Sequence, residues 1–154
     1  MERTHRIMFV CHGNICRSPM AEFLLKDMIK KEGLADRFVI ASAGTSREEI
    51  GNPVHQGTRK KLAQDHISAA GKYAVQLTKE DYEKYDRILG MDRANISNIL
   101  RIIGSDQQEK MNRQLDFTEL PRDIADPWYT GDFEITYAEI KAGCAALLKH
   151  LRRF

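Results

Sequence analysis

The sequence has few cysteines and no long apolar run. Its 154 residues include three cysteines, and an odd number in a chain of this size does not suggest a disulfide framework. No apolar run approaches the roughly 20 residues that span a bilayer, and the N-terminal residues lead into a predicted strand without the apolar region of a signal peptide. We therefore expect a protein of the reducing cytoplasm that does not associate with a membrane.

An excess of charge of one sign is also lacking. The formal net charge is +2, although 30% of the residues are charged. A general nucleic-acid-binding protein would carry a strong basic excess, so this balance argues against nucleic acid as a partner. The short basic clusters at 30–31 and 59–61 are better explained as solvated helix faces.

The apolar pattern predicts strands that alternate with helices in a single domain, residues 1–154. The length suits one hydrophobic core, and no repeat, low-complexity segment or long linker divides the sequence. Such alternation indicates a parallel sheet with helices on both faces. The predicted strands are 7–10, 38–42, 88–91 and 114–117. The predicted helices are 19–31, 53–64, a short helix capped by 78–81, a helix capped by Asp92, and 133–151. The apolar face of the helix after Asp92 carries Ile96, Ile99, Leu100 and Ile103.

The segment 11–18 is the most informative part of the sequence. It reads Cys-His-Gly-Asn-Ile-Cys-Arg-Ser and joins the apolar strand 7–10 to a helix expected to start near Ser18 and Pro19. At such a junction backbone N–H groups converge, and the helix dipole favours an anion, including a thiolate. Cys11 is thus placed to act as a nucleophile, and Arg17 is placed to bind an oxyanion with two-pronged donor geometry.

Three more residues of this segment have features that suit an anion-binding loop. Gly13 permits a tight bend and a close approach of backbone N–H groups to the anion. Asn14 tolerates left-handed backbone angles, and its amide can tie the loop together. Ser18 has two explanations, as a helix cap or as a hydroxyl donor to the sulfur of Cys11.

Two separated motifs resemble one enzyme family. Residues 10–22, Val-Cys-His-Gly-Asn-Ile-Cys-Arg-Ser-Pro-Met-Ala-Glu, closely resemble the signature of the low-molecular-weight protein tyrosine phosphatases, and Ala-Asp-Pro-Trp-Tyr at 125–129 resembles their general-acid loop. Weaker similarity at 42–45, 76–78 and 91–92 extends the resemblance over essentially the whole chain. The resemblance implies a three-layer α/β/α fold with four parallel strands in the order 2-1-3-4. It also implies phosphotyrosine-containing proteins as substrates, with no cofactor and no metal, and we expect a monomer.

The resemblance also implies the roles of the site residues. Cys11 would form a phosphocysteine intermediate, Arg17 would hold the phosphate, and Asp126 would act as general acid and then general base. Pro127 restricts Asp126 to extended backbone angles, which helps to fix its loop. Of the two explanations for Ser18, the resemblance implies the hydroxyl donor. The residues expected to bind substrate are His12, Gly13, Asn14, Ile15, Cys16, Ser18, Trp128 and Tyr129, and the last two would form a wall for a phenyl ring.

The other cysteines have different expected roles. Cys16 lies within reach of a reversible disulfide with Cys11 after a local shift, which would protect the nucleophile from further oxidation. Cys144 lies on the apolar face of the last helix and is expected to be inert. Cys11, His12 and Cys16 also suggest zinc, but structural zinc uses paired short spacings that supply four ligands, and the sequence has no second cluster.

Three other functions compete with the phosphotyrosine phosphatase. A related class of protein arginine phosphatases tends to carry Thr at the position of Ile15, and the aliphatic residue here suits an aromatic ester better. Arsenate reductases with this fold need additional cysteines, for which Cys144 is badly placed. A non-catalytic phosphate-binding or redox-sensing module would not need Cys11, Arg17 and Asp126 together.

The sequence departs from the family pattern at three places. A histidine that commonly braces the phosphate-binding loop is replaced by Lys72 or Tyr73. A pocket aromatic is replaced by Arg-Glu-Glu at 47–49, a negative pair that would disfavour acidic peptides. The Asp-Pro-Arg segment of the family is replaced near 54–56. These differences leave the expected chemistry intact and bear on the choice of substrate.

Overall fold

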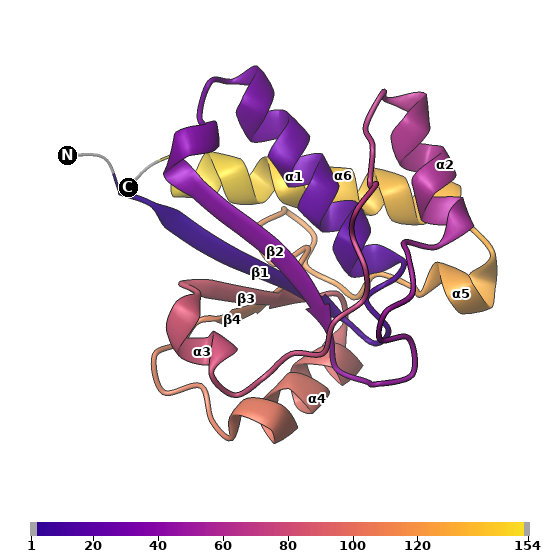
Figure 1. Ribbon diagram of the computed structural model, residues 1–154. Helices are drawn as coiled ribbons and strands as arrows, with labels where there is room; N and C mark the ends of the chain where they lie inside the picture. The colour runs from indigo at the N-terminus through magenta and orange to yellow at the C-terminus, as the bar shows by residue number, and fades with distance from the viewer. Residues whose placement is uncertain (1–2, 153–154) are drawn as a thin grey trace.

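A four-stranded parallel sheet forms the centre of the computed structural model, which describes residues 3–152 (Figure 1). The strands are β1 (His5–Cys11), β2 (Phe38–Gly44), β3 (Arg87–Gly90) and β4 (Met111–Arg113). They lie in the order β2-β1-β3-β4, and every neighbouring pair is parallel, which confirms the predicted sheet and strand order. Because parallel strands end at the same edge, Cys11 and Gly44 lie beside each other at the carboxyl edge of the sheet.

Helices cover both faces of the sheet. One layer consists of α1 (Arg17–Lys31), α2 (Gln56–Gln64) and α6 (Phe133–Leu151) (Figure 1). The other face carries α3 (Asp81–Lys84) and α4 (Arg93–Ile103). A short helix α5 (Pro127–Thr130) precedes α6, and a 3₁₀ turn η1 (Ala35–Arg37) precedes β2. Alternate residues of β1 face the two cores: Phe9 packs in the core under α1 and α6, and Val10 in the core under α4. Within residues 3–152, no helix is long and apolar enough to cross a membrane.

Helix α1 begins two residues earlier than the sequence predicts. Arg17 is its first residue, and Cys16 occupies the N-cap position without a side-chain cap. The expectations that Ser18 caps this helix and that Pro19 is its first residue are therefore wrong. The physical reason is that the Ser18 hydroxyl has other partners, the Cys11 sulfur and the Asn14 amide, and so it does not bond the backbone of the first turn.

Two further boundaries and one predicted apolar position differ from the predictions. β4 lies at Met111–Arg113 rather than 114–117, because the Asp116 carboxylate accepts the N–H of Arg113 at 2.7 Å and closes a turn there. α2 begins at Gln56 rather than 53, because Nδ1 of His55 accepts the N–H of Gly57 at 3.0 Å and caps the helix. Leu100, predicted on the apolar face of α4, is 37% exposed.

Candidate active site

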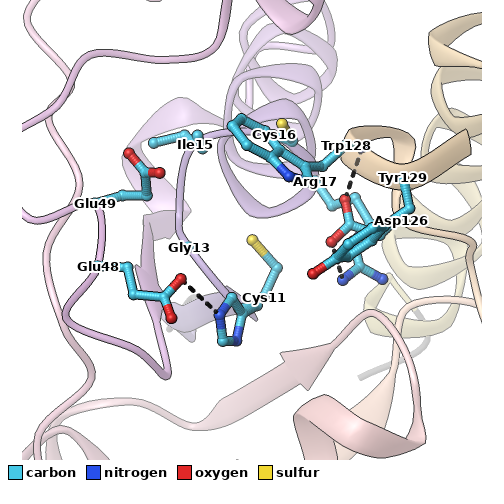
Figure 2. Close-up of a pocket in the computed structure, with 11 residues that line it drawn as sticks. Cys11, Gly13, Ile15, Cys16, Arg17, Glu48, Glu49, Asp126, Trp128 and Tyr129 are labelled. Atoms are coloured by element: carbon cyan, nitrogen blue, oxygen red, sulfur yellow. Dashed lines mark hydrogen bonds and ion pairs between the residues drawn. The ribbon is translucent and has the colours of Figure 1, made fainter. Parts of the chain in front are cut away.

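The segment 11–18 curves around the sulfur of Cys11 at the carboxyl edge of the sheet (Figure 2). We call this segment the phosphate loop. Because α1 begins at Arg17, the first backbone N–H groups of the helix have no partner within it. One of them, the N–H of Ser18, lies 3.4 Å from Sγ of Cys11. The sulfur therefore lies at the positive end of the dipole of α1.

The segment that follows β2 holds the phosphate loop from one side. The N–H of Thr45 donates to the carbonyl of Cys11 at 2.9 Å, and the N–H of Ser46 donates to the carbonyl of His12 at 3.0 Å. A Cβ atom on Gly44 would lie 2.8 Å from that His12 carbonyl oxygen, so only glycine permits this approach. Gly44 was not predicted as a site residue.

Asn14 ties the phosphate loop together behind Cys11. Its φ of 58° is left-handed, as the sequence predicts. Its Nδ2 donates to Oγ of Ser18 at 2.8 Å and to Oγ of Ser42 at 3.0 Å, and its Oδ1 accepts the N–H of Val75 at 3.1 Å. Oγ of Ser18 in turn lies 3.0 Å from Sγ of Cys11. Of the two roles considered for Ser18, the structure therefore supports the hydroxyl contact with the Cys11 sulfur and not the helix cap.

Arg17 is held between two carboxylates. Its side chain is 3% exposed, Nη1 donates to Asp92 and to the carbonyl of Ile124, both at 2.7 Å, and Nη2 lies 3.5 Å from Asp126. Burial disfavours the charged guanidinium, but the charges of Cys11, Asp92 and Asp126 outweigh burial and raise the pKa of Arg17. Arg17 is therefore a fixed positive charge at the pocket. Asp92, predicted as the cap of α4 and as a carboxylate that could face the strand ends, also fixes this guanidinium.

Asp126 caps α5 and faces Arg17. Its Oδ1 accepts the N–H of Trp128 at 3.0 Å, and its φ of −77° and ψ of 116° are extended, as the following Pro127 predicts. The side chain is 22% exposed, and it lines the same pocket as Cys11. A solvent-accessible carboxyl group therefore lies beside the nucleophile and the guanidinium.

The pocket has an aromatic side and an acidic side (Figure 2). Trp128 and Tyr129 are 57% and 82% exposed, so neither is a core residue. Across the pocket lie Glu48 and Glu49, and Glu48 pairs with Nε2 of His12 at 3.3 Å. Neither glutamate was among the residues predicted to bind substrate, but the resemblance placed both at the pocket wall, where they replace a family aromatic. The lining residues are 11–13, 15–17, 48–49, 126 and 128–129.

Two predicted site residues lie behind the pocket rather than in it. Asn14 and Ser18 are 1% and 0% exposed, and neither lines the cavity.

Of the two residues that could replace the family histidine, Lys72 reaches the region behind the phosphate loop. Its Nζ donates to the carbonyl of Ser42 at 2.9 Å, whereas Tyr73 is 56% exposed.

Cys16 and Cys144 differ from Cys11 in their surroundings. Burial, together with the charges of Cys11 and Asp126, raises the pKa of Cys16 to about 12, so this thiol is neutral at physiological pH. Burial likewise raises the pKa of Cys144 to about 12, and all three cysteines are free thiols. Among residues 3–152, no group of three His, Cys, Asp or Glu side chains is placed to hold a metal ion.

Comparison with known proteins decides the family. The model of the low molecular weight phosphotyrosine protein phosphatases matches residues 6–154. The chain belongs to this family. The low molecular weight protein-tyrosine-phosphatase YfkJ of Bacillus subtilis is 40% identical over 149 residues, which are 96% of each chain. PtpA of Staphylococcus epidermidis, with the same family name, is 34% identical over 146 residues, 94% of this chain and 92% of PtpA.

Solved structures agree with the family assignment. The crystal structure of YfkJ superimposes with a TM-score of 0.94 at 39% identity, and the match covers 97% of this chain and 96% of that chain. SP-PTP, the low molecular weight protein tyrosine phosphatase of Streptococcus pyogenes, gives a TM-score of 0.86 at 37% identity, with 96% and 93% covered. These matches confirm the predicted family and fold. Cys11 and Arg17 lie at the phosphate-loop positions that a cysteine-nucleophile phosphatase requires.

Proposed function

We propose that this protein hydrolyses phosphotyrosine in proteins through a phosphocysteine intermediate on Cys11. The observation that carries the proposal is the convergence of Cys11, Arg17 and Asp126 on one pocket that has an aromatic side. A sulfur nucleophile, a two-pronged phosphate ligand and a proton donor are the groups that displacement at phosphorus by this route needs.

In the first step the Cys11 thiolate attacks phosphorus and forms an S–P bond, while the bond from phosphorus to the phenolic oxygen breaks. Arg17 binds the phosphoryl oxygens and stabilises their charge in the transition state. Its orientation supports this role, because Asp92 and the Ile124 carbonyl already fix Nη1. Asp126, in its protonated form, donates its proton to the leaving oxygen.

In the second step water attacks phosphorus and the S–P bond breaks, which releases inorganic phosphate. Asp126, now ionised, accepts the proton from the attacking water. The departing sulfur becomes a thiolate again, and the Ser18 hydroxyl 3.0 Å away is placed to stabilise it.

The pocket favours an aromatic ester over a phosphoramidate. Ile15 lines the cavity and presents no hydroxyl group that could position water at phosphorus, and Trp128 and Tyr129 offer flat apolar surface to a phenyl ring. Cys144 argues against the arsenate reductase, because it is 0% exposed in α6 and cannot pass a disulfide along. We further propose a single-domain monomer of the reducing cytoplasm, which the odd number of cysteines and the length of 154 residues support.

Turnover of a phosphotyrosine peptide and of a phosphoarginine peptide, with and without a thiol reductant, tests the proposal. We expect kcat/KM to be at least about a hundredfold higher for phosphotyrosine, a difference of roughly 3 kcal/mol in transition-state binding. A preference for phosphoarginine would contradict the substrate assignment. Turnover of neither peptide, in reduced protein that binds phosphate, would favour the non-catalytic module.

A further inference from the structure

A buried carboxylate lies behind the phosphate loop. Glu22 projects from α1, and its side chain is 6% exposed. Its Oε1 accepts the hydroxyl of Ser42 at 2.5 Å, and its Oε2 accepts Nζ of Lys26 at 2.6 Å. The proposed reaction does not use this carboxylate. An uncompensated negative charge here would oppose the formation of a thiolate at Cys11.

Lys72 is a second cation near Glu22, on the buried side. Its Nζ lies 3.9 Å from Oε1 of Glu22 and donates to the carbonyl of Ser42 at 2.9 Å. The Lys72 side chain is 13% exposed, compared with 42% for Lys26. Burial lowers the pKa of Lys72, although the charges of Glu22 and Cys11 oppose this shift. Lys72 is therefore the less hydrated of the two cations and the one that also bonds β2.

The hydrogen bonds that start at Glu22 run in one direction. An ionised carboxylate only accepts, so the single hydrogen of the Ser42 hydroxyl is donated to Glu22. Oγ of Ser42 then accepts from Nδ2 of Asn14 at 3.0 Å. The orientation of this amide is fixed, because the N–H of Val75 requires Oδ1 of Asn14 as its acceptor.

The same direction continues to the nucleophile. The second hydrogen of the Asn14 amide goes to Oγ of Ser18 at 2.8 Å, so the hydroxyl hydrogen of Ser18 is left for another acceptor. Sγ of Cys11 lies 3.0 Å from this hydroxyl, and the carbonyl of Ala43 lies 3.4 Å from it. The nearer acceptor is the sulfur, and a hydrogen bond to it is stronger when it is a thiolate.

We propose that Lys72 is a positioning residue of the active site. It holds the Glu22 carboxylate and the Ser42 carbonyl, and so keeps the Ser18 hydroxyl directed at the Cys11 sulfur. Its positive charge also offsets the negative charge of Glu22. Lys72 does not touch the substrate and acts through the residues between Glu22 and Cys11. The inference rests on the proposed function, because it concerns the nucleophile of that reaction.

Other charged and titratable groups surround both ends of this network. Around Cys11 these groups are Arg17 with its partners Asp92 and Asp126, the Cys16 thiol, and His12, Glu48 and Glu49 at the pocket. Around Glu22 they are Lys26 of α1 and Tyr85 after α3. Substitution of Lys72 changes none of these side chains. A shift in the pH dependence of Cys11 in such a variant therefore reports on the Lys72 charge.

The test compares Lys72→Met, which removes the charge, with Lys72→Arg, which keeps it. Lys61→Met is the matched control, because the Lys61 side chain is 11% exposed and pairs with Glu134 at 2.9 Å, outside this network. The pH dependence of iodoacetate alkylation of Cys11 is measured together with kcat/KM for a small aryl phosphate. Alkylation is the cleaner readout, since it does not depend on the ionisation of a phosphate substrate.

We expect Lys72→Met to move the acidic limb of both profiles to higher pH by about half a unit to one unit, as loss of one nearby partly buried charge predicts. On that limb kcat/KM should fall about threefold to tenfold. Lys72→Arg should restore most of the limb, and Lys61→Met should leave it unchanged. If Lys72→Met does not fold, Lys72→Gln removes the same charge with a polar side chain and should give the same shift.

An acidic limb that stays in place in the uncharged variants would overturn the inference, even if their free energy of unfolding falls, because a merely structural lysine predicts that result. Failure of the proposed function gives a different pattern. In that case the wild-type protein itself would not turn over aryl phosphate, or Cys11→Ser would retain turnover.

Discussion

Ser18 makes two contacts with the sulfur of Cys11: its Oγ lies 3.0 Å away and its backbone N–H lies 3.4 Å away. The two groups come from the first turn of α1, so the helix supplies both a side-chain donor and a backbone donor to the nucleophile. This geometry stabilises the sulfur most when it is negatively charged, which is before attack on phosphorus and again when the phosphocysteine breaks down.

Cys11→Ser should abolish aryl phosphatase activity and preserve phosphate binding, because the loop and Arg17 remain. Retention of more than about a hundredth of wild-type turnover would count against covalent catalysis, which contributes several kcal/mol to the lowering of the barrier. In the wild-type protein, iodoacetate should label Cys11 below neutral pH, and inorganic phosphate should protect it. Mass spectrometry of the labelled peptide is the measurement.

Ser18→Ala should slow the breakdown of the phosphocysteine more than its formation. Loss of a hydrogen bond to a charged group costs about 1.5–3 kcal/mol, which is roughly a tenfold to hundredfold lower rate. Rapid-mixing kinetics with an aryl phosphate that has a good leaving group should show a larger burst and a slower steady state. Ser97→Ala, an exposed serine of α4, is the control. Equal slowing of both steps would show that Ser18 has no special role in thiolate departure.

Asp126→Ala should lower turnover of phenyl or tyrosyl phosphate by about 10²–10⁴-fold, the usual range for a positioned proton donor. A substrate with a strongly acidic phenol should lose less in its first step, since that leaving group needs no proton. Single-turnover rates for the two substrates are the measurement, together with the basic limb of kcat/KM, which should flatten. Equal losses for both substrates with an unchanged basic limb would leave Asp126 as a structural cap of α5.

Mild peroxide should inactivate the protein and join Cys11 to Cys16, and a thiol reductant should restore activity. Both thiols lie at the same pocket, so a local shift of the loop can bring the sulfurs together. Cys16→Ser should keep its activity and lose the reversibility, because the sulfenic acid on Cys11 then has no resolving thiol nearby. Absence of a peptide cross-linked between Cys11 and Cys16 in oxidised wild-type protein would refute this pathway.

Asp106→Asn should lower the free energy of unfolding at pH 7 by about 0.5–1.5 kcal/mol, the usual net contribution of a hydrogen bond, because the amide weakens a partly buried hydrogen-bond cluster. Burial opposes the charge of Asp106, but hydrogen bonds from the Tyr82 hydroxyl and from the N–H groups of Lys110 and Met111 outweigh it and lower the pKa of Asp106. Since the folded pKa is lower than the unfolded value of about 3.9, this stabilisation is present above about pH 4 and is lost as the pH falls through the folded value.

Urea unfolding at pH 7 and near pH 3 measures this effect. The difference between wild-type and Asp106→Asn should shrink at the lower pH, whereas Asp36→Asn, at an exposed position, should differ little from wild-type at both. A difference that does not change with pH would mean that ionisation of Asp106 contributes nothing to stability.

The structure confirms most of the local predictions, and its corrections have local causes too. The cap of α4 at Asp92 and the left-handed Asn14 agree with the sequence, because each depends on residue type and on near neighbours. The strand order agrees with what the family resemblance implies. The predicted start of α1 is wrong because it requires the Ser18 hydroxyl to cap the backbone of the first helical turn. In the structure this hydroxyl contacts Cys11 and Asn14 instead. Sequence pattern does not reveal which hydrogen-bond partners a hydroxyl group takes.

The sequence by itself determined the strand, loop and helix that present Cys11 and Arg17, and the aspartate before proline at 126. These features lie within short segments, where apolar period, helix start and proline geometry act between adjacent residues. Only the tertiary structure brought Asp92 onto Arg17, Glu48 and Glu49 to the pocket, and Glu22 and Lys72 to the region behind the phosphate loop. Those partners come from separate elements, and their contacts exist only because the parallel sheet places the ends of β1, β2 and β3 side by side.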